Sequence, residues 1–359
     1  LPLRTPFRAA HGTRAVREAL LVRVVTPASE GWGECVAPEE PTYTEEYLDG
    51  AQDVITRHLV PLLASWDGGD PAGITGALAR VRGHRMAKAS LEAAVLDAAL
   101  REAGRSLASF LGGVRSLVPA GVAVGIAPSL SALVDEVGAY LACGYRQVKL
   151  KIAPGWDVAP VRAVREQFAA DLELLVDANG AYHRADAAVL AALDVFGLTM
   201  IEQPLAPDDL VGHAELARSI RTPVCLDESV TSAAVVETAV RLGACRFVSV
   251  KAARVGGLLE ARRVHDVCVA AGVGVRCGGM LETGVGRAAS LALASLPGFD
   301  GPGDLSASSR YFATDVTDAF ELESGALRVP GGPGIGVEPL AEALAALAVG
   351  RWWVAVGDH

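Results

Sequence analysis

The sequence lacks several features that define whole classes of protein. Its six cysteines form no CxxC pair, and it has neither a Walker motif nor a Ser/His/Asp nucleophile elbow. The longest charge-free stretch, residues 116–134, contains two prolines and two glycines, so it does not fit a membrane-spanning helix. The first residues, LPLRTPF, show no signal-peptide pattern. We therefore expect a cytoplasmic protein whose cysteines are buried, reduced thiols.

The composition is that of a folded globular chain. The 359 residues are 51% hydrophobic and 21% charged, which excludes both a disordered chain and a small disulfide-stapled scaffold. Lysine and arginine total 32 against 42 aspartate and glutamate residues, giving a net charge of −10. Because such a surface repels phosphate groups, we expect neither nucleic acids nor anionic membranes as partners.

The first 115 residues have the pattern of an α+β unit. The predicted elements are a β-hairpin (18–26 and 31–36) and helices over 44–63 and 85–103. In the second helix, Asp97 and Arg101 are expected to pair outside the apolar face. The last twenty residues contain a further helical pattern and a strand-like WWVAV, expected to pack back on this unit.

Between these parts, short apolar runs alternate with helical segments. The runs are VPAGVAVGI, QVKLKI, LELLVDAN, TMIEQP, TPVCLDES, FVSVKAAR, GVGVRCGG and a weaker GDLSAS. Near-continuous apolar strands separated by helices predict a parallel α/β sheet. Eight such units in about 190 residues favour a closed barrel. A doubly wound open sheet would need a glycine-rich turn after its first strand, where APSLS stands instead.

Five charged residues stand at the carboxyl ends of consecutive predicted strands: Lys151, Asp177, Glu202, Asp227 and Lys251. Their separations of 26, 25, 25 and 24 residues each correspond to one strand–helix repeat. Because the carboxyl ends of barrel strands face one mouth, we expect these side chains to converge there. A lone Asp in such a place is usually a helix cap and a lone Lys a surface residue, but five in phase indicate a functional site.

The residue types in this set indicate metal-assisted proton abstraction. Three converging carboxylates repel one another unless a hard cation neutralises them, and oxygen ligands suit Mg²⁺, with Mn²⁺ as a substitute. The absence of His and Cys from the set disfavours zinc. A lysine could remove a proton next to a substrate carboxylate if its pKa fell from about 10.4 towards ~7–8. The cation would stabilise the negative charge that then develops.

Several motifs resemble those of the enolase superfamily. They are VKLKI, LLVDANG, MIEQPL, CLDES, VKAARVGG and GGMLETGVGR. The Lys-x-Lys on the second strand, with a lysine on the sixth, is similar to the muconate-lactonizing subgroup. GGMLETGVGRA, TPFRAAHGT and GWGECVAPEEPTYTEEY resemble the o-succinylbenzoate synthase / N-succinylamino acid racemase family. The resemblance covers nearly the whole chain. It implies a modified (β/α)7β TIM-type barrel (116–317) beneath an α+β capping domain (1–115, with 318–359 packing back on it).

The resemblance also implies the roles of the five residues. Asp177, Glu202 and Asp227 would bind Mg²⁺. Lys151 would serve as general base and acid, and Lys251 would act from the opposite face of the substrate.

Further residues are implied to contact the substrate. Lys149 and Asn179 would support its carboxylate or orient Lys151, and Arg254 matches a position of racemase-competent members. The remaining expected substrate contacts are Met280 and Ser306.

The chain departs from the family pattern at three positions. Ala123 stands where a serine is expected, Arg276 where a tryptophan is usual, and Ser290 where an asparagine is typical. These differences leave the substrate fit open. Mandelate racemase-like members use a histidine on the seventh strand, which GVGVRCGGMLET lacks. Dipeptide epimerases carry Asp-x-Asp on the last strand, where this chain has GDLSAS.

The resemblance therefore implies an Mg²⁺-dependent o-succinylbenzoate synthase, a lyase of menaquinone biosynthesis. The alternative is N-succinylamino acid racemase activity, alone or alongside. More remote alternatives are a muconate cycloisomerase-type enzyme and a non-catalytic ligand-binding barrel. The expected partner is a small-molecule carboxylate, and we expect a homo-oligomer because relatives of this kind often assemble.

Overall fold

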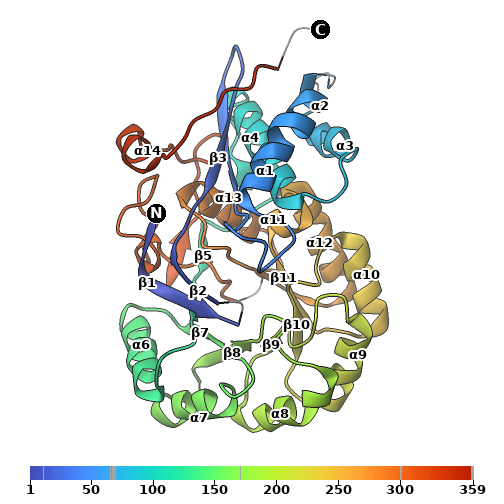
Figure 1. The fold of residues 1–359 in the computed structure, drawn as a ribbon, viewed down its shortest axis with the longest axis vertical. Coiled ribbons are helices and arrows are strands. Elements are labelled where there is room, and N and C mark those ends of the chain that lie inside the picture. The colour runs from blue at the N-terminus through green and yellow to red at the C-terminus, as the bar shows by residue number, and fades with distance from the viewer. Residues whose placement is uncertain (11, 65, 67–69, 170, 300, 357–359) are drawn as a thin grey trace.

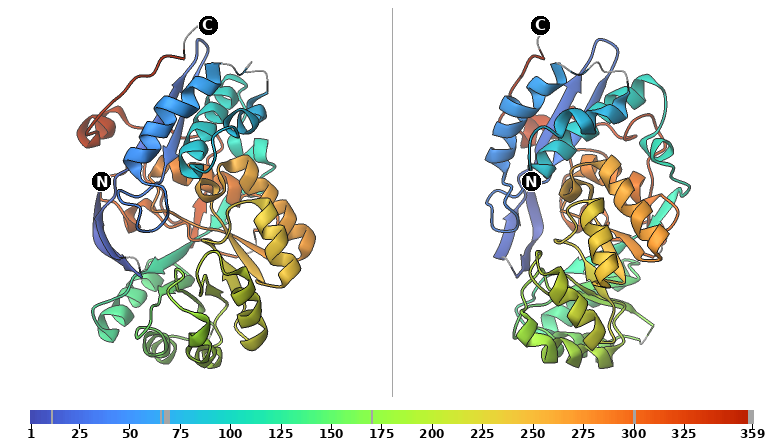
Figure 2. Two further views of the ribbon diagram at one scale, coloured as in Figure 1. Left: turned by 45° about the vertical axis from the view of Figure 1, so that its right-hand side comes forward. Right: turned by 90° about the vertical axis from the view of Figure 1, so that its right-hand side faces the viewer.

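A computed structural model describes residues 1–10, 12–64, 66, 70–169, 171–299 and 301–356. Figure 1 places α1–α4 and β3 at one end of the molecule and helices α6–α9 at the other, with the hairpin of β1 and β2 lying beside the barrel. The two further views in Figure 2 show the same division. The boundary between these parts positions the candidate site.

Seven parallel strands form one curved sheet whose spatial order, β12-β11-β10-β9-β8-β7-β6, follows the sequence. The strands are β6 Gly121–Val124, β7 Gln147–Lys151, β8 Glu173–Asp177, β9 Ile201–Glu202, β10 Val224–Leu226, β11 Phe247–Val250 and β12 Gly274–Cys277. The helices around them are α6 Leu130–Ala142, α7 Val158–Gln167, α8 Ala187–Ala191, α9 Leu210–Ser219, α10 Ala233–Leu242, α11 Ala252–Val255, α12 Leu258–Ala271 and α13 Gly284–Ala294. Short 3₁₀ turns occupy Arg184–Asp186, Ala192–Phe196 and Ser308–Arg310. The predicted α/β barrel is thus confirmed.

The GDLSAS run closes the ring. Within the described chain it forms no regular strand, but it hydrogen-bonds to both edges of the sheet. Gly121 N donates to Gly303 O (2.8 Å) on the β6 side, and Asp304 N donates to Cys277 O (2.9 Å) at the end of β12. The weak eighth pattern therefore marks a bridging segment.

The capping part contains the predicted hairpin and helices, together with a second hairpin, β1 with β2, that was not predicted. Its strands are β1 Pro2–Ala9, β2 Gly12–Val16, β3 Leu20–Val25 and β4 Glu30–Cys35. Its helices are α1 Leu48–Val54, a π-helical turn Ile55–Leu59, α2 Val60–Ala64, a 3₁₀ turn Pro71–Gly73, α3 Ile74–Leu78, α4 Arg85–Glu102 and α5 Leu107–Leu111. Strand β4 lies directly on α4. A Cβ on Gly31 would be 2.2 Å from Ala94 O, and one on Gly33 would be 2.0 Å from Ser90 O, so the GWG sequence permits this close approach.

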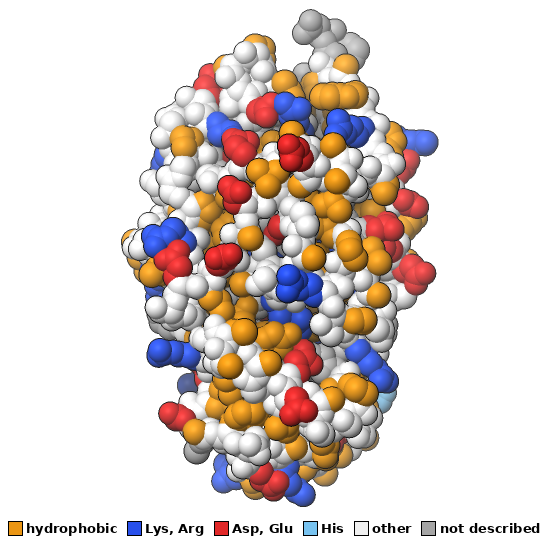
Figure 3. Space-filling view, turned by 90° about the vertical axis from the view of Figure 1, so that its left-hand side faces the viewer, with side chains coloured by type: hydrophobic (Ala, Val, Ile, Leu, Met, Phe, Trp, Pro, Cys, Tyr) orange, Lys and Arg blue, Asp and Glu red, His pale blue; other side chains and the backbone are white. Residues whose placement is uncertain are grey.

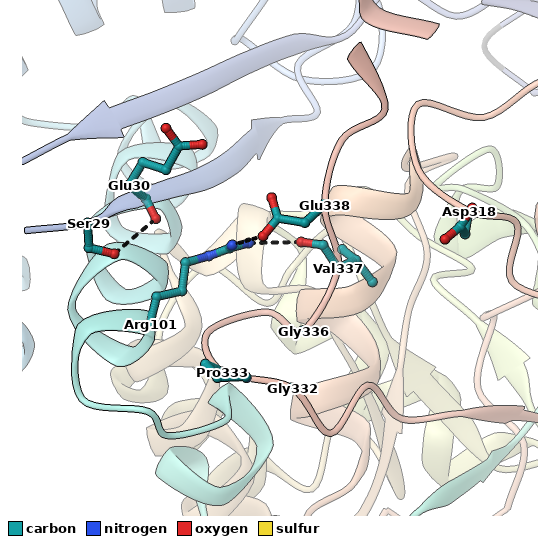
Figure 4. A pocket seen from close by; sticks show the side chains of 9 residues that line it. All are labelled: Ser29, Glu30, Arg101, Asp318, Gly332, Pro333, Gly336, Val337 and Glu338. Atoms are coloured by element: carbon teal, nitrogen blue, oxygen red, sulfur yellow. Dashed lines mark hydrogen bonds and ion pairs between the residues drawn. The ribbon is translucent and has the colours of Figure 1, made fainter. Parts of the chain in front are cut away.

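The C-terminal segment contacts both parts of the molecule. Strand β13 Ala326–Arg328 pairs with β5 Leu117–Pro119, and helix α14 Ala341–Leu347 follows. Asp97 and Arg101 pair as predicted (2.9 Å), but the expectation that they lie outside the apolar face is wrong for Asp97. Its carboxylate is fully buried and accepts Ile335 N (2.7 Å) from the C-terminal segment. Arg101 also binds Val337 O at the wall of a cavity of about 660 Å³ (Figure 4).

The predicted strand at WWVAV is wrong. Residues 351–356 have no regular structure and are exposed, with Trp353 79% accessible. This short run of apolar and β-branched residues has no neighbouring strand in the described chain to pair with, so its composition alone does not make a strand.

The surface is mixed in charge (Figure 3), and most of the cysteines are buried. On the face seen in Figure 3, basic and acidic side chains are interspersed with apolar ones. Five cysteines are buried as predicted, whereas Cys143 is exposed, and all six are free thiols. Among the described residues, no helix is both long and apolar enough to cross a membrane.

The raised pKa of Glu92, in α4, predicts that the stability of the protein depends on pH. Glu92 is buried between the capping part and the barrel, and burial raises its pKa from 4.5 to about 7. The folded protein therefore binds a proton at Glu92 as the pH falls through 7, whereas the unfolded chain binds it only near pH 4.5. This proton adds to the free energy of unfolding at low pH, and its contribution is lost as the pH rises through 7. Relative to Glu92→Gln, the wild-type free energy of unfolding should fall by up to about 3 kcal/mol between pH 5 and pH 8.5.

Urea unfolding of both proteins across this pH range measures the effect. Glu237→Gln, on the exposed side of α10, is the control and should track the wild type. Parallel stability curves for Glu92→Gln and the wild type would contradict the assignment of the proton to Glu92.

Candidate active site

The five in-phase residues lie at the barrel mouth, as the repeat predicts. Lys151, Asp177 and Glu202 end strands β7, β8 and β9, and Asp227 and Lys251 directly follow β10 and β11. All five side chains are buried, with accessible fractions of 0–8%. The structure therefore brings two lysines and three carboxylates into one enclosed cluster.

At the β7 end of the cluster, Lys151 is fixed by two acceptors. Its Nζ lies 2.6 Å from Asp177 Oδ2 and 2.8 Å from Asn179 Oδ1. Asn179 adopts a left-handed backbone (φ 44°), and its amide donates to Glu228 Oε1 (2.9 Å). Asn179 thus contacts Lys151 directly, and the two roles predicted for it stay predictions.

At the β11 end, Lys251 forms the matching arrangement. Its Nζ lies 2.5 Å from Asp227 Oδ2, and Arg254 Nε lies 3.6 Å from Asp227 Oδ1. Tyr43, from the capping part, reaches both cations: its Oη lies 3.5 Å from Lys251 Nζ and also accepts a hydrogen bond from Arg254. Arg254 is buried, so it is not a surface arginine.

Lys149 occupies the middle of the cluster. Its Nζ lies 2.9 Å from Glu202 Oε1 and 3.1 Å from Asp177 Oδ2, and it also binds Asp304. The chain contains only four lysines against 28 arginines, and three of the four are in this cluster. Arginine is not readily deprotonated, whereas lysine is, so this concentration of lysine favours proton transfer at the mouth.

The charges inside the cluster shift one another's proton affinities. Burial opposes ionisation of Asp177 and Asp227, but Lys151 beside the first and Lys251 beside the second outweigh it, so both pKa values lie below the ordinary range. Burial, together with the neighbouring acids, raises the pKa of Glu202 despite Lys149. The cluster therefore contains lysine ammonium groups and carboxylates that are buried from water and interact strongly with one another.

The carboxylates fit a hard divalent cation by their chemistry. Asp227 Oδ1 is buried and has no hydrogen-bond partner among the described residues, so it remains available as a ligand. In this structure the ammonium groups of Lys149, Lys151 and Lys251 contact the three carboxylates. In the described part of the chain, no three His, Cys, Asp or Glu side chains form a ready-made metal-binding group. A bound cation would take over contacts that the lysines now make.

Gln203 links two of the acid-bearing strands. Its Oε1 accepts Asp227 N (2.9 Å) and Ser229 N (3.1 Å), and its Nε2 donates to Leu205 O (3.0 Å) and Ser229 Oγ (2.8 Å). The amide has no free hydrogen-bonding group, which explains why a glutamine follows Glu202 in MIEQPL.

The other two predicted substrate contacts, Met280 and Ser306, lie in different surroundings from each other. Met280 lines a small cavity beside Lys251. Ser306 is fully buried, and its hydroxyl donates to Gly121 O (2.7 Å), so it is engaged within the barrel wall.

The three departures from the family pattern are also located. Ala123 lies in β6 beside Lys149, and Ser290 lines the same small cavity as Lys251. Arg276 binds Gln147 and lies 3.6 Å from Glu173; both begin their strands, at the barrel end opposite the mouth. Arg276 therefore does not affect the substrate fit from within the mouth.

Sequence reasoning missed three residues of the cluster. Asp304 belongs to the weak GDLSAS run, whose position after the seventh strand could have identified it. Tyr43 and Phe7, whose ring centroid lies 6.0 Å from Lys151 Nζ, belong to capping segments whose approach to the barrel is not periodic in sequence.

Comparisons with known proteins agree with this arrangement. The chain matches the family "Enolase C-terminal domain-like" over residues 132–343. It matches "Mandelate racemase / muconate lactonizing enzyme, N-terminal domain" over residues 1–112. An N-succinylamino acid racemase of an Amycolatopsis species is 56% identical, covering 99% of this chain and 96% of that protein. An o-succinylbenzoate synthase of Geobacillus kaustophilus is 46% identical, covering 94% and 90%.

A solved structure of an enolase-superfamily member from Listeria innocua has a TM-score of 0.92 at 41% identity, covering 96% of this chain and 94% of that one. Muconate lactonizing enzyme from Pseudomonas fluorescens, in complex with muconolactone, has a TM-score of 0.91 at 27% identity, covering 96% and 95%. This chain therefore belongs to the mandelate racemase / muconate lactonizing enzyme family of the enolase superfamily.

Proposed function

We propose that this protein is an o-succinylbenzoate synthase that also racemises N-succinylamino acids. The observation that carries the proposal is the buried cluster in which Lys151 and Lys251 stand at opposite ends of three carboxylates. Relatives of 42–56% identity bear these two names, which supports the same pair of reactions here.

In the synthase reaction the substrate is 2-succinyl-6-hydroxy-2,4-cyclohexadiene-1-carboxylate. Lys151 takes the proton α to the ring carboxylate. The same ammonium then protonates the hydroxyl group that leaves from the same face. The C–H and C–O bonds break, a ring double bond forms, and water departs. Asn179 holds Lys151 Nζ in place during both transfers.

Racemisation requires a second acid on the other face of the same carbon. The separation of Lys151 and Lys251 supports this role, because each is held by a carboxylate at its own end of the cluster. The buried Arg254 beside Asp227 supports racemisation further, since it matches the position expected in racemase-competent members.

A divalent cation, Mg²⁺ with Mn²⁺ as a substitute, completes the proposal. The resemblance to the family implies a divalent metal, and Asp177, Glu202 and Asp227, which are buried together at the mouth, would hold it here. When bound, it stabilises the negative charge on the substrate carboxylate. Lys149 would hold the same carboxylate from the protein side.

The direct test is turnover of the cyclohexadiene hydroxy acid by the purified chain with Mg²⁺, followed by product absorbance. N-succinylamino acids are tested in parallel by incorporation of deuterium at Cα. Absence of both activities in the folded, Mg²⁺-supplied protein would reject the proposal.

Removing the metal should abolish both reactions. We expect EDTA dialysis to lower each rate by at least ~10³-fold, because electrostatic stabilisation of the developing charge is lost. Restoring Mg²⁺ should restore both rates, and Asp227→Asn should weaken Mg²⁺ binding in calorimetry. Full activity in the metal-free protein would contradict the assignment.

Assembly into a homo-oligomer, the cytoplasmic location and the domain limits at residues 115 and 317 stay predictions. Light scattering of the intact chain would test the first.

A further inference from the structure

A buried carboxylate of the capping part reaches into the barrel on the Lys251 side. Glu92, in α4, is 1% exposed. Its Oε1 accepts Leu259 N (3.1 Å) in the first turn of α12, and its Oε2 accepts Thr75 Oγ1 (2.9 Å). The carboxylate therefore satisfies a backbone donor at the start of a barrel helix.

The barrel has a glycine where this carboxylate enters. Gly257 precedes α12 with φ 146°, a conformation that side-chain-bearing residues rarely adopt. A Cβ there would lie 2.3 Å from Glu92 Oε1. A glycine at residue 257 therefore allows this backbone conformation and leaves room for the Glu92 carboxylate.

The segment that Glu92 holds carries the reactive groups of one face. Lys251 is the residue before α11, Arg254 lies within α11, and Gly257 N bonds back to Ala252 O (2.9 Å). The segment from Lys251 to Leu259 is thus short and internally bonded. Strand β11 fixes one end of it, and Glu92 fixes the other.

The opposite face of the site has no such dependence on Glu92. Lys151 is held by Asp177 and Asn179, both of which belong to the barrel. Loss of the Glu92 contact should therefore disturb Lys251 and leave Lys151 in place.

We propose that Glu92 is a positioning residue for the Lys251 half of the site, and that its contact with the barrel influences proton transfer on the Lys251 face and not on the Lys151 face. This inference rests on the proposed racemase activity. In that reaction each enantiomer of an N-succinylamino acid loses its α-proton to one lysine, so the two faces can be measured separately.

The test follows α-proton exchange of each enantiomer of an N-succinylamino acid in D₂O. The enantiomer whose exchange is lost in Lys251→Ala identifies the Lys251 face. Glu92→Leu fills the space but makes neither hydrogen bond, and should slow exchange on that face about tenfold or more relative to the other. Glu92→Gln can accept from Leu259 N and donate to Thr75, and should stay within about twofold of the wild type.

Asp194→Asn is the matched control. Asp194 also accepts two backbone N–H groups, from Arg221 (2.9 Å) and Thr222 (2.7 Å), but just before β10, at the barrel end away from the mouth. It should leave the ratio of the two exchange rates unchanged. Equal slowing of both enantiomers in Glu92→Leu would overturn the proposal, because a general loss of folding affects both faces.

A second measurement needs no substrate. Amide hydrogen exchange over residues 252–262 should be faster in Glu92→Leu than in the wild type and Glu92→Gln, with α9 unchanged. If the wild type exchanged neither enantiomer, the proposed racemase activity would fail, and this measurement alone would decide the role of Glu92. Equal protection of residues 252–262 in all three proteins would then reject it.

Discussion

Replacing Lys151 with alanine is expected to abolish both proposed reactions. The dehydration and the racemisation both begin or end with a proton on Lys151 Nζ, which is held by Asp177 and Asn179 within hydrogen-bond distance. Lys149 is engaged by Glu202 and Asp304, and we expect it not to replace Lys151 as the base. Loss of a positioned general base commonly costs 10²–10⁴-fold, and we expect a fall of at least ~10³-fold in kcat for both substrates.

The chain supplies a control for this experiment. Lys88, in α4, is the one lysine outside the cluster, and Lys88→Ala should keep both rates near those of the wild type. Circular dichroism and the urea midpoint of Lys151→Ala separate a catalytic effect from loss of fold. Synthase activity that survives in a folded Lys151→Ala protein would mean that the base has been misassigned.

The positions of the reactive residues were predictable because the barrel repeats. One strand–helix unit of about 25 residues returns the chain to the same mouth, so the phase of Lys151, Asp177, Glu202, Asp227 and Lys251 encodes their convergence. Burial of the strands followed from their apolar runs in the same way.

The contacts between distant elements were not predictable. The pairing of Asp97 with the C-terminal segment, the entry of Glu92 beside Gly257, and the reach of Tyr43 to Lys251 join parts of the chain separated by more than 150 residues. No periodic sequence pattern indicates such contacts, because they depend on how the capping part, the barrel and the C-terminal segment pack against one another. The strand predicted at WWVAV failed for a related reason: a short apolar run forms a strand only where a partner edge exists.

Replacing Lys251 should separate the two reactions. Racemisation needs a proton donor on each face, so Lys251→Ala should lower it by at least ~10³-fold. Dehydration uses Lys151 alone for its proton transfers, and we expect it to fall by only ~10–100-fold, through loss of the positive charge beside Asp227. In D₂O the variant should still exchange the α-proton of one enantiomer, without forming the other.

Lys251→Arg distinguishes the charge of Lys251 from its proton. Arginine keeps a cation beside Asp227 but is not deprotonated at neutral pH, so racemisation should stay absent while dehydration recovers relative to Lys251→Ala. The comparison is measured as kcat for dehydration against the rate of enantiomer interconversion in the same preparations. Racemisation near the wild-type rate in either variant would mean that Lys251 is not the second acid, and the two-lysine arrangement would then account for the synthase reaction only.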